Sequence, residues 1–475
     1  MIINFDALIK KSSLREMALK IAEAGYEAIE IPKVVSERIN IEKGRFLKIK
    51  YNTADSVNPI SDNEMALRLD LDDFKRVFLI GIGKGSSLAA LTLLKILLPL
   101  GHRFVGGVSL DTEIPNPKSQ ISNKSRIINS KIKFLTGTHP LPSRKNVEAT
   151  KKIIKLAKNL KKDDLLITFV CGGGSALLCG SEKELKYSQT IFKELTKAGA
   201  DIKELNTVRK HLSDIKGGGL AKLAYPATVI SLIISDVPTA NNDLSMVASG
   251  PTVYDKTAKK DAEAILKKHN LRPTTYNLRL LETPKDKKYF KNVKNILFFS
   301  NREPILAMAR KAKKLGFESK IYSLKLKGEA RKALIGLTLS VCPGEAAMAG
   351  GETTVTLKKS KIKNQKSKLQ IKNQKLGKGG RNMEAVLSII TNNLITNNLI
   401  ILSIASDGRD NTEAAGAIGD ILTLKKAQKL KLNPREFLNN HNSFNFFKKT
   451  GDLIFTKKNS FNVADLMLVL SESKE

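Results

Sequence analysis

Five segments of the chain share one pattern that sharply limits the folds open to it. Each segment has a short apolar run, then a turn containing glycine or aspartate, then a stretch with helical character. The runs are rich in β-branched and aliphatic residues without polar alternation, which is typical of strands buried on both faces. Helices between such strands indicate crossover connections and a parallel sheet. The five segments are residues 76–98, 164–178, 227–238, 295–316 and 399–418.

This pattern predicts an α/β fold, and a length of 475 residues suggests two or three domains. A polar, lysine-rich stretch at 256–294 contains Pro273 and Pro284, so we place a domain boundary in or near it. The span 358–378 has nine lysines and no acidic residue. It indicates a low-complexity insertion, expected as a solvated loop between two strands. A basic binding arm is the other interpretation of the insertion.

The basic charge of the chain needs a separate explanation. Lys and Arg number 81 against 46 Asp and Glu, which gives a formal net charge of +35. Such a charge is typical of nucleic-acid-binding proteins and also attracts anionic substrates. Aromatic residues are only 5% and tryptophan is absent, so few side chains could stack on bases. Three cysteines exclude a disulfide scaffold, and no apolar stretch suits a membrane span, so we expect a cytoplasmic protein.

Two glycine-rich turns follow apolar runs and are candidates for anion binding. In GIGKGSS, at 81–87, glycines let backbone N–H groups converge before a helix, and Lys84 adds a positive charge. The second turn, CGGGSALL at 171–178, is another phosphate-type cradle. The first turn lacks Walker A spacing, and Ser86 fills the third glycine position of G-x-G-x-x-G. Tight turns with a surface lysine and a capping serine are the alternative. The candidate phosphate- or nucleotide-binding residues are Gly83, Gly85, Ser86, Gly172, Gly173, Gly174 and Ser175.

Charged residues gather in three further motifs. NTVRKHLSDIKGGGLA begins at residue 206 and contains Arg209, whose guanidinium suits an oxyanion, although glycines capping a cationic helix end would give the same pattern. Asp236 follows one buried strand, and Asp407 and Asp410 follow another. A carboxylate in such a place is costly unless it holds a metal, acts as a base or accepts strong hydrogen bonds. Two phosphate-type turns with two carboxylate clusters are typical of magnesium-dependent phosphoryl transfer.

In this order, eight segments of the chain resemble the glycerate 2-kinase family: GIGKGSS, THPLPSRKN (138–146), CGGGSALL, NTVRKHLSDIKGGGLA, SDVP…ASGPTVYD, GGETTV (350–355), GKGGRNMEAVL (377–387) and ASDGRDNTEAAGA. The last three resemble its C-terminal MOFRL-type domain. The resemblance implies ATP-dependent phosphorylation of D-glycerate at the 2-hydroxyl, giving 2-phosphoglycerate and ADP. It also implies a Rossmann-like N-terminal domain, expected at 1–256, and a smaller α/β domain at 257–475, with the active site in the cleft between them.

The resemblance further implies roles for individual residues. Lys84, Asp236 and Arg381 match the family's catalytic positions. Lys84 would neutralise phosphate or carboxylate charge, Asp236 would accept the hydroxyl proton or organise Mg²⁺, and Arg381 would stabilise the transferring phosphoryl group. ATP and Mg²⁺ are the expected cofactors and D-glycerate the expected partner, with a homodimer as the expected assembly. Membrane and nucleic-acid partners are not expected. The expected substrate-binding residues are Asn206, Arg209, Glu384, Asp407 and Asp410.

Some positions depart from the family pattern and keep other functions open. Gly85 and Ser86 follow Lys84 where the family usually has GKA, and Thr239 replaces a glycine after SDVP. The final loop, FTKKNSFNVADL, lacks the family's glycines. A nucleic-acid-associated binding protein, suggested by the basic charge, is one alternative. A dinucleotide-dependent oxidoreductase, suggested by the glycine turns, is the other.

Overall fold

A computed structural model describes residues 1–52, 64–115, 131–236, 243–271, 278–357, 377–458 and 461–473. The chain divides into two compact units. The central unit is Ile31–Ser300, and the terminal unit combines Met1–Glu30 with Asn301–Glu475. Across the described ranges, no helix has both the length and the apolar character needed to cross a membrane.

The central unit is built on a parallel sheet with the strand order β6-β5-β4-β7-β8-β9. From the neighbouring strands β4 and β7 the chain proceeds outward in opposite directions. The topological switch point, where ligands bind in open α/β sheets, is therefore between β4 and β7. The strands are β4 (Arg76–Ile82), β5 (Phe104–Asp111), β6 (Ile132–Thr136), β7 (Asp164–Val170), β8 (Thr228–Ile234) and β9 (Val293–Phe299).

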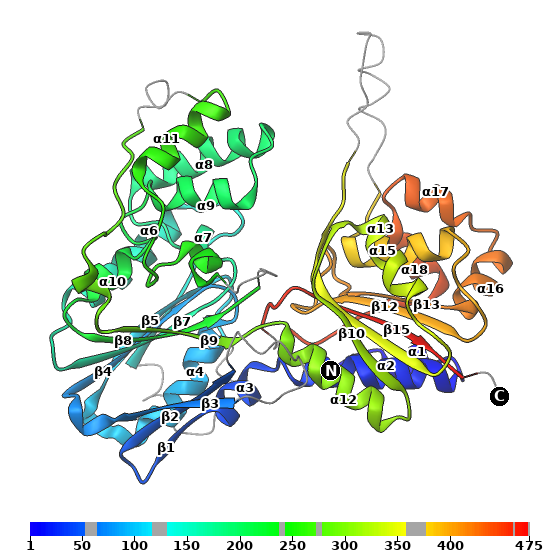
Figure 1. Ribbon diagram of the computed structural model, residues 1–475, viewed down its shortest axis with the longest axis horizontal. Helices are drawn as coiled ribbons and strands as arrows, with labels where there is room; N and C mark the ends of the chain where they lie inside the picture. Colours follow the sequence, from blue (N-terminus) through cyan, green and yellow to red (C-terminus); the bar gives the residue numbers. More distant parts are fainter. Residues whose placement is uncertain are drawn as a thin grey trace. The chain divides into compact units, whose positions relative to one another are not determined.

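Helices and a small antiparallel sheet cover the two faces of this parallel sheet (Figure 1). Helix α6 illustrates why such helices pack on the sheet. Every third or fourth residue of it is buried and together these form one stripe, made of Val147, Thr150, Ile153 and Ala157. One face carries α6 (Arg144–Lys158), α7 (Gly174–Leu177), α8 (Glu182–Lys197), α9 (Ile202–Lys210), α10 (Gly219–Ala224) and α11 (Lys259–Lys268). The other carries α3 (Ile31–Arg38), α4 (Ser86–Leu97), β1 (Ile39–Glu42), β2 (Phe46–Asn52) and β3 (Glu64–Asp70). Short 3₁₀ segments are η1 (Leu71–Asp73), η2 (Leu98–Arg103), η4 (Leu244–Ser249) and η6 (Lys287–Phe290).

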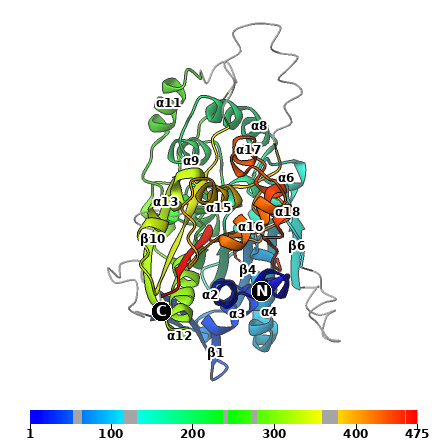
Figure 2. The ribbon, with the colours of Figure 1, turned by 90° about the vertical axis from the view of Figure 1, so that its right-hand side faces the viewer.

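The terminal unit has a mixed sheet with the strand order β10-β11-β15-β12-β13-β14. Only β10 and β11 pair in parallel among its described strands. Helices α1 (Phe5–Ile9), α2 (Ser13–Glu27) and α12 (Arg302–Lys314) cover one face (Figure 2). The other face carries α13 (Ala330–Leu339), α15 (Arg381–Thr391), α16 (Ile421–Lys429), α17 (Pro434–Asn439) and α18 (Ser443–Thr450). The strands are β10 (Glu318–Glu329), β11 (Glu345–Thr354), β12 (Leu399–Ala405), β13 (Gly416–Gly419), β14 (Leu453–Ile454) and β15 (Asp465–Ser471).

One of the five repeated segments, 399–418, does not continue into the predicted helix. Strand β12 is followed by β13, which returns antiparallel to it. A Cβ on Gly416 would lie 1.9 Å from the Ser403 carbonyl oxygen, so glycine is required for this close pairing. The prediction of a helix after β12 is therefore wrong, because the glycine lets the two backbones approach closely enough to pair as strands.

The predicted two-domain α/β fold is confirmed, but the compact units are divided at a different place. Strand β9 adds to the sheet of the central unit, so that unit extends to Ser300 and past the expected boundary at 256/257. The first 30 residues pack with residues 301–475. The predicted insertion at 358–378 lies outside the described residues except for its last two positions, so its loop structure stays a prediction.

Candidate active site

The two glycine turns lie side by side at the switch point of the parallel sheet. The backbone N–H of Lys84 donates to the Gly172 carbonyl over 2.9 Å, and the N–H of Cys171 donates to the Ile82 carbonyl over 2.8 Å. Gly83 has φ +105, and a Cβ there would lie 2.4 Å from the Cys171 carbonyl oxygen. Any side chain at Gly83 would therefore separate the two turns. The structure thus brings together two segments that the sequence places 90 residues apart.

Several backbone N–H groups of these turns are candidates to bind an anion. Gly85, Gly172, Gly173 and Ser175 donate no backbone hydrogen bond within the part of the chain that the structure describes. Gly85 and Gly173 directly precede α4 and α7, where N–H groups at the helix start carry a partial positive charge. Converging donors of this kind suit an anion such as a phosphate group.

Three side chains converge on the second turn. A Cβ on Gly172 would lie 1.8 Å from Oδ2 of Asp236, and a Cβ on Gly173 would lie 3.3 Å from Cγ of Lys84. The same position on Gly173 is 3.3 Å from Cδ2 of His139. Lys84 and Asp236 are half-buried, while His139 is exposed. The predicted pair of Lys84 and Asp236 is therefore assembled around one backbone segment, with a histidine beside it.

Ser86 faces the interior rather than the turn. It is fully buried, and its Oγ lies 3.3 Å from Oγ of Ser109 on the neighbouring strand. The backbone N–H of Ser86 donates to the Gly83 carbonyl. The side chain of Ser86 therefore attaches α4 to the sheet, and its backbone N–H is already used within the turn. Neither group is left to donate to a phosphate, as the sequence had predicted for Ser86.

Two buried groups near the turns have raised pKa values. Burial raises the pKa of Asp111 to about 6, although this carboxylate accepts a hydrogen bond from the N–H of Ser87 at the start of α4. Burial, together with the charges of Asp111 and Asp236, raises the pKa of the Cys171 thiol well above its ordinary value. Cys171 is therefore held as a neutral thiol and is not an activated nucleophile.

A chain of hydrogen bonds joins the second turn to the NTVRKH motif. Oγ of Ser175 lies 2.9 Å from Oγ of Ser249, and Ser249 donates to Oδ1 of Asn206 over 3.0 Å. Arg209 also donates to Asn206 Oδ1, from Nη1 over 3.3 Å. Three predicted ligand-binding residues, Ser175, Asn206 and Arg209, thus belong to one cluster in the central unit.

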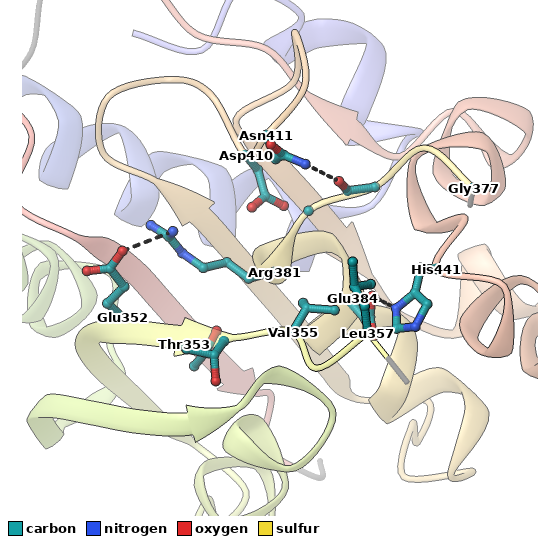
Figure 3. A pocket seen from close by; sticks show the side chains of 13 residues that line it. Glu352, Thr353, Val355, Leu357, Gly377, Arg381, Glu384, Asp410, Asn411 and His441 are labelled. Carbon is teal, nitrogen blue, oxygen red and sulfur yellow. Dashed lines mark hydrogen bonds and ion pairs between the residues drawn. The ribbon is translucent and has the colours of Figure 1, made fainter. Parts of the chain in front are cut away.

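The terminal unit has its own pocket, with a volume of about 560 Å³ (Figure 3). It brings together three predicted residues, Arg381, Glu384 and Asp410. Asp407 does not line it; this carboxylate accepts a hydrogen bond from the N–H of Arg409. The remaining lining residues are Glu352, Thr353, Thr354, Val355, Leu357, Gly377, Gly379, Gly380, Asn411 and His441.

Acidic residues surround Arg381 in this pocket. Its Nε and Nη2 donate to both oxygens of Asp465, at 2.6 and 2.9 Å, and its Nη1 lies 3.1 Å from Glu352. Burial lowers the pKa of Arg381, but the bonds to Asp465 outweigh this and raise it overall. Burial also raises the pKa of Asp465. Arg381 is therefore held in place by a bidentate ion pair, which neutralises part of its charge.

The other two predicted residues of the pocket also have protein partners. Asp410 accepts from the backbone N–H groups of Asn382 and Met383 at the start of α15, and burial raises its pKa to about 7. Glu384 is buried and accepts from Nε of Arg331 and Nδ1 of His441. Both side chains thus have structural partners in addition to facing the pocket.

Sequence reasoning missed three residues of these sites: His139, Ser249 and His441. His139 and Ser249 fall inside quoted motifs, THPLPSRKN and ASGPTVYD, but their spacing gave no chemical role. His139 follows strand β6 at the same edge of the sheet as the glycine turns, which is the signal that would have drawn attention to it. In the described ranges, no three histidine, cysteine or acidic side chains group so as to hold a metal ion.

The fold and the paired turns define a two-domain α/β protein whose parallel sheet carries an anion-type cradle at its switch point. The chain matches the family described as a domain of unknown function (DUF4147) over residues 17–280 and the MOFRL family over 345–465. It is 35% identical to the glycerate 2-kinase of Pyrococcus horikoshii over 72% of this chain and 79% of that protein. The chain belongs to the glycerate 2-kinase family, as the sequence resemblance predicted.

Two further similarities bear on this assignment. The crystal structure of glycerate kinase from Thermotoga maritima matches with a TM-score of 0.75 and 27% identity, over 97% of this chain and 99% of that one. A protein of Agrobacterium vitis with the provisional name of hydroxypyruvate reductase is 34% identical, over 72% of this chain and 77% of its own length. Relatives with both kinase and reductase names therefore share this fold family.

Proposed function

We propose that this protein is an ATP-dependent glycerate 2-kinase that converts D-glycerate to 2-phosphoglycerate and ADP. One observation carries the proposal: in a chain of this family, Lys84 and Asp236 flank two abutting glycine turns at the switch point of the sheet. The turns supply donors for phosphate groups, Lys84 supplies a cation, and Asp236 supplies a carboxylate. These are the groups that phosphoryl transfer to a hydroxyl requires.

The residues present suit ATP and Mg²⁺. The N–H groups of Gly85, Gly172, Gly173 and Ser175, which have no backbone acceptor among the described residues, would hold phosphate oxygens. Mg²⁺ usually takes one or two protein carboxylates and completes its shell with phosphate oxygens and water, so Asp236 alone would be enough to anchor it. When bound, the ion supplies positive charge that offsets the charge of the phosphates.

Each predicted residue then has a role in the reaction. Lys84 neutralises negative charge as it develops, and Asp236 either accepts the proton of the 2-hydroxyl or anchors the ion. Arg381, held by Asp465, stabilises the transferring phosphoryl group. The substrate-binding residues we propose are Asn206, Arg209, Glu384, Asp407 and Asp410.

A dinucleotide-dependent reductase is the second candidate, favoured by the name of the Agrobacterium vitis relative. The position of Ser86 argues against it. In the dinucleotide motif the third glycine allows close helix–strand packing, whereas here a buried serine occupies that position and bonds to the neighbouring strand. A homodimer and a cytoplasmic location stay predictions.

A pair of assays on the purified protein tests the proposal. The first follows ADP release from ATP and Mg²⁺ with D-glycerate, and the second follows NADH or NADPH oxidation with hydroxypyruvate. We expect glycerate-dependent ADP release that Lys84→Met abolishes, and no nucleotide oxidation. Reduction of hydroxypyruvate without ADP release would refute the proposal.

A further inference from the structure

Arg209 is a half-buried cation with no carboxylate partner among the residues that the structure describes. A guanidinium has five N–H donors, and the contact with Asn206 uses only one of them. No carboxylate forms an ion pair with Arg209 anywhere in the described ranges of the chain. The neighbouring residue on α9, Lys210, does have an acidic partner: its Nζ lies 3.2 Å from Oδ1 of Asp255. Of these two neighbouring cations, Lys210 is therefore paired with a carboxylate, whereas Arg209 has no such partner among the described residues.

The surroundings of Arg209 hold it without neutralising it. Its Cζ lies 4.6 Å from the ring centre of Phe192, a cation–π contact. Burial lowers the pKa of Arg209, the direction expected for a cation that no acid compensates. Leaving such a charge partly desolvated is costly unless an anion arrives to pair with it.

A relay of hydroxyl groups fixes Asn206 and, through it, Arg209. Ser249 donates its only hydroxyl proton to Asn206 Oδ1, so Ser175 must be the donor in its contact with Ser249. Ser249 has φ +57 and the preceding Ala248 has φ +51, a strained backbone for residues other than glycine. Strain of this kind is typical of sites that hold a functional group in a required position.

We infer that Arg209 is the clamp for the carboxylate of the substrate, with Asn206, Ser249 and Ser175 as its positioning residues. The inference rests on the proposed function and specifies which anion each part of the site takes. The glycine turns already offer N–H donors for phosphates, which leaves the planar fork of Arg209 for the other anion of the reaction. Ser175 lies in α7, only three residues after Gly172, and Gly172 is packed against the carboxylate of Asp236. Helix α7 therefore connects the clamp to Asp236, the residue proposed to act on the hydroxyl group.

Steady-state kinetics of Arg209→Gln test the clamp. We expect the KM for D-glycerate to rise about 100-fold, since the variant removes one partner of a charge-assisted bidentate contact, while the KM for ATP stays within about twofold. D-glyceramide, in which an amide replaces the carboxylate, measures the same effect from the ligand side. The wild type should prefer D-glycerate strongly, and the variant should lose most of this preference. Ser249→Ala should raise the KM for D-glycerate several-fold and leave the KM for ATP unchanged.

Two further variants keep the test interpretable. Lys203→Gln removes a positive charge from an exposed position on the same helix and should leave both KM values unchanged. Arg209→Lys keeps the charge but not the fork, and should fall between wild type and Arg209→Gln; it also replaces Arg209→Gln if that variant does not fold. A raised KM for ATP with an unchanged KM for D-glycerate would overturn the inference and make Arg209 a phosphate ligand. Unchanged kinetics would also overturn it.

A binding measurement separates this inference from the proposed function. Calorimetric titration of D-glycerate without ATP should show binding to the wild type and to Lys203→Gln, and at least 30-fold weaker binding to Arg209→Gln. If the wild type binds D-glycerate in this manner but transfers no phosphoryl group, the proposed function fails and the clamp stands. If the wild type and Arg209→Gln bind equally, or if neither binds, the clamp is refuted.

Discussion

Gly172→Ala places one methyl group against the carboxylate of Asp236. The new Cβ would lie 1.8 Å from Oδ2, whereas ordinary van der Waals contact begins near 3.4 Å. The carboxylate must therefore move by about 1.6 Å, and misplacing a reacting group by about 1 Å can cost about 100-fold in rate. We expect turnover with D-glycerate, ATP and Mg²⁺ to fall by at least about 100-fold. Gly172 does not have a left-handed backbone, so alanine there is not strained, and the fold should persist.

The matched control is Gly180→Ala, which lies in the same unit. Its Cβ would meet Oε2 of Glu184 at 3.4 Å and Cδ1 of Ile154 at 3.6 Å, both ordinary contacts. This variant should keep wild-type turnover and gain about 0.4–1 kcal/mol of stability, because alanine restricts the unfolded chain. ADP release and thermal unfolding are measured for both variants. If Gly172→Ala stays folded and retains more than about a third of wild-type turnover, the position of the Asp236 carboxylate beside Gly172 is not required for the reaction.

Three further predictions follow from single residues. Lys84→Met should lower turnover on the order of 10³-fold with an unchanged melting temperature, because it removes the cation that we propose neutralises phosphate charge. Activity near the wild-type level would contradict the site. Arg15 is fully buried and forms ion pairs with Asp420 and Asp452. Arg15→Met should therefore lower the free energy of unfolding, measured in urea, by about 3–5 kcal/mol. A loss below about 1 kcal/mol would contradict the presence of these buried ion pairs. Burial raises the pKa of Asp410 from 3.8 to about 7, so the folded state retains a proton that the unfolded chain releases between these values, and stability falls as pH rises through this window. Asp410→Asn should flatten that decline in melting temperature, and identical pH profiles would show that Asp410 is not perturbed.

The sequence predicted the parts of the fold that depend on local pattern. The segments 76–98 and 164–178 fold as a strand, a glycine turn and a helix, because each carries its own apolar run and its own turn. The segment 295–316 also gives a strand and a helix. Its β9 joins the central unit and its α12 the terminal unit, a division that depends on which sheet accepts each element. Local pattern cannot predict such long-range pairing.

The candidate site was predicted to the same extent and for the same reason. Glycines and charged residues after strands marked Lys84 and Asp236, because strand ends of a parallel sheet meet at one edge. Arg209 was marked by the suitability of its guanidinium for an oxyanion. The inward orientation of Ser86 depends on Ser109 of another strand, and the relay through Ser249 depends on an unusual backbone. Neither feature can be predicted from the spacing of residues in the sequence.

Phosphorus-31 NMR of the reaction product tests the central claim most directly. Purified protein is incubated with ATP, Mg²⁺ and D-glycerate, and the position of the new phosphate ester is assigned from its coupling to the protons of the carbon that bears it. Our account predicts 2-phosphoglycerate, with a doublet from the single proton on C2, together with an equal amount of ADP. A triplet from 3-phosphoglycerate, or no phosphate ester at all, would contradict it.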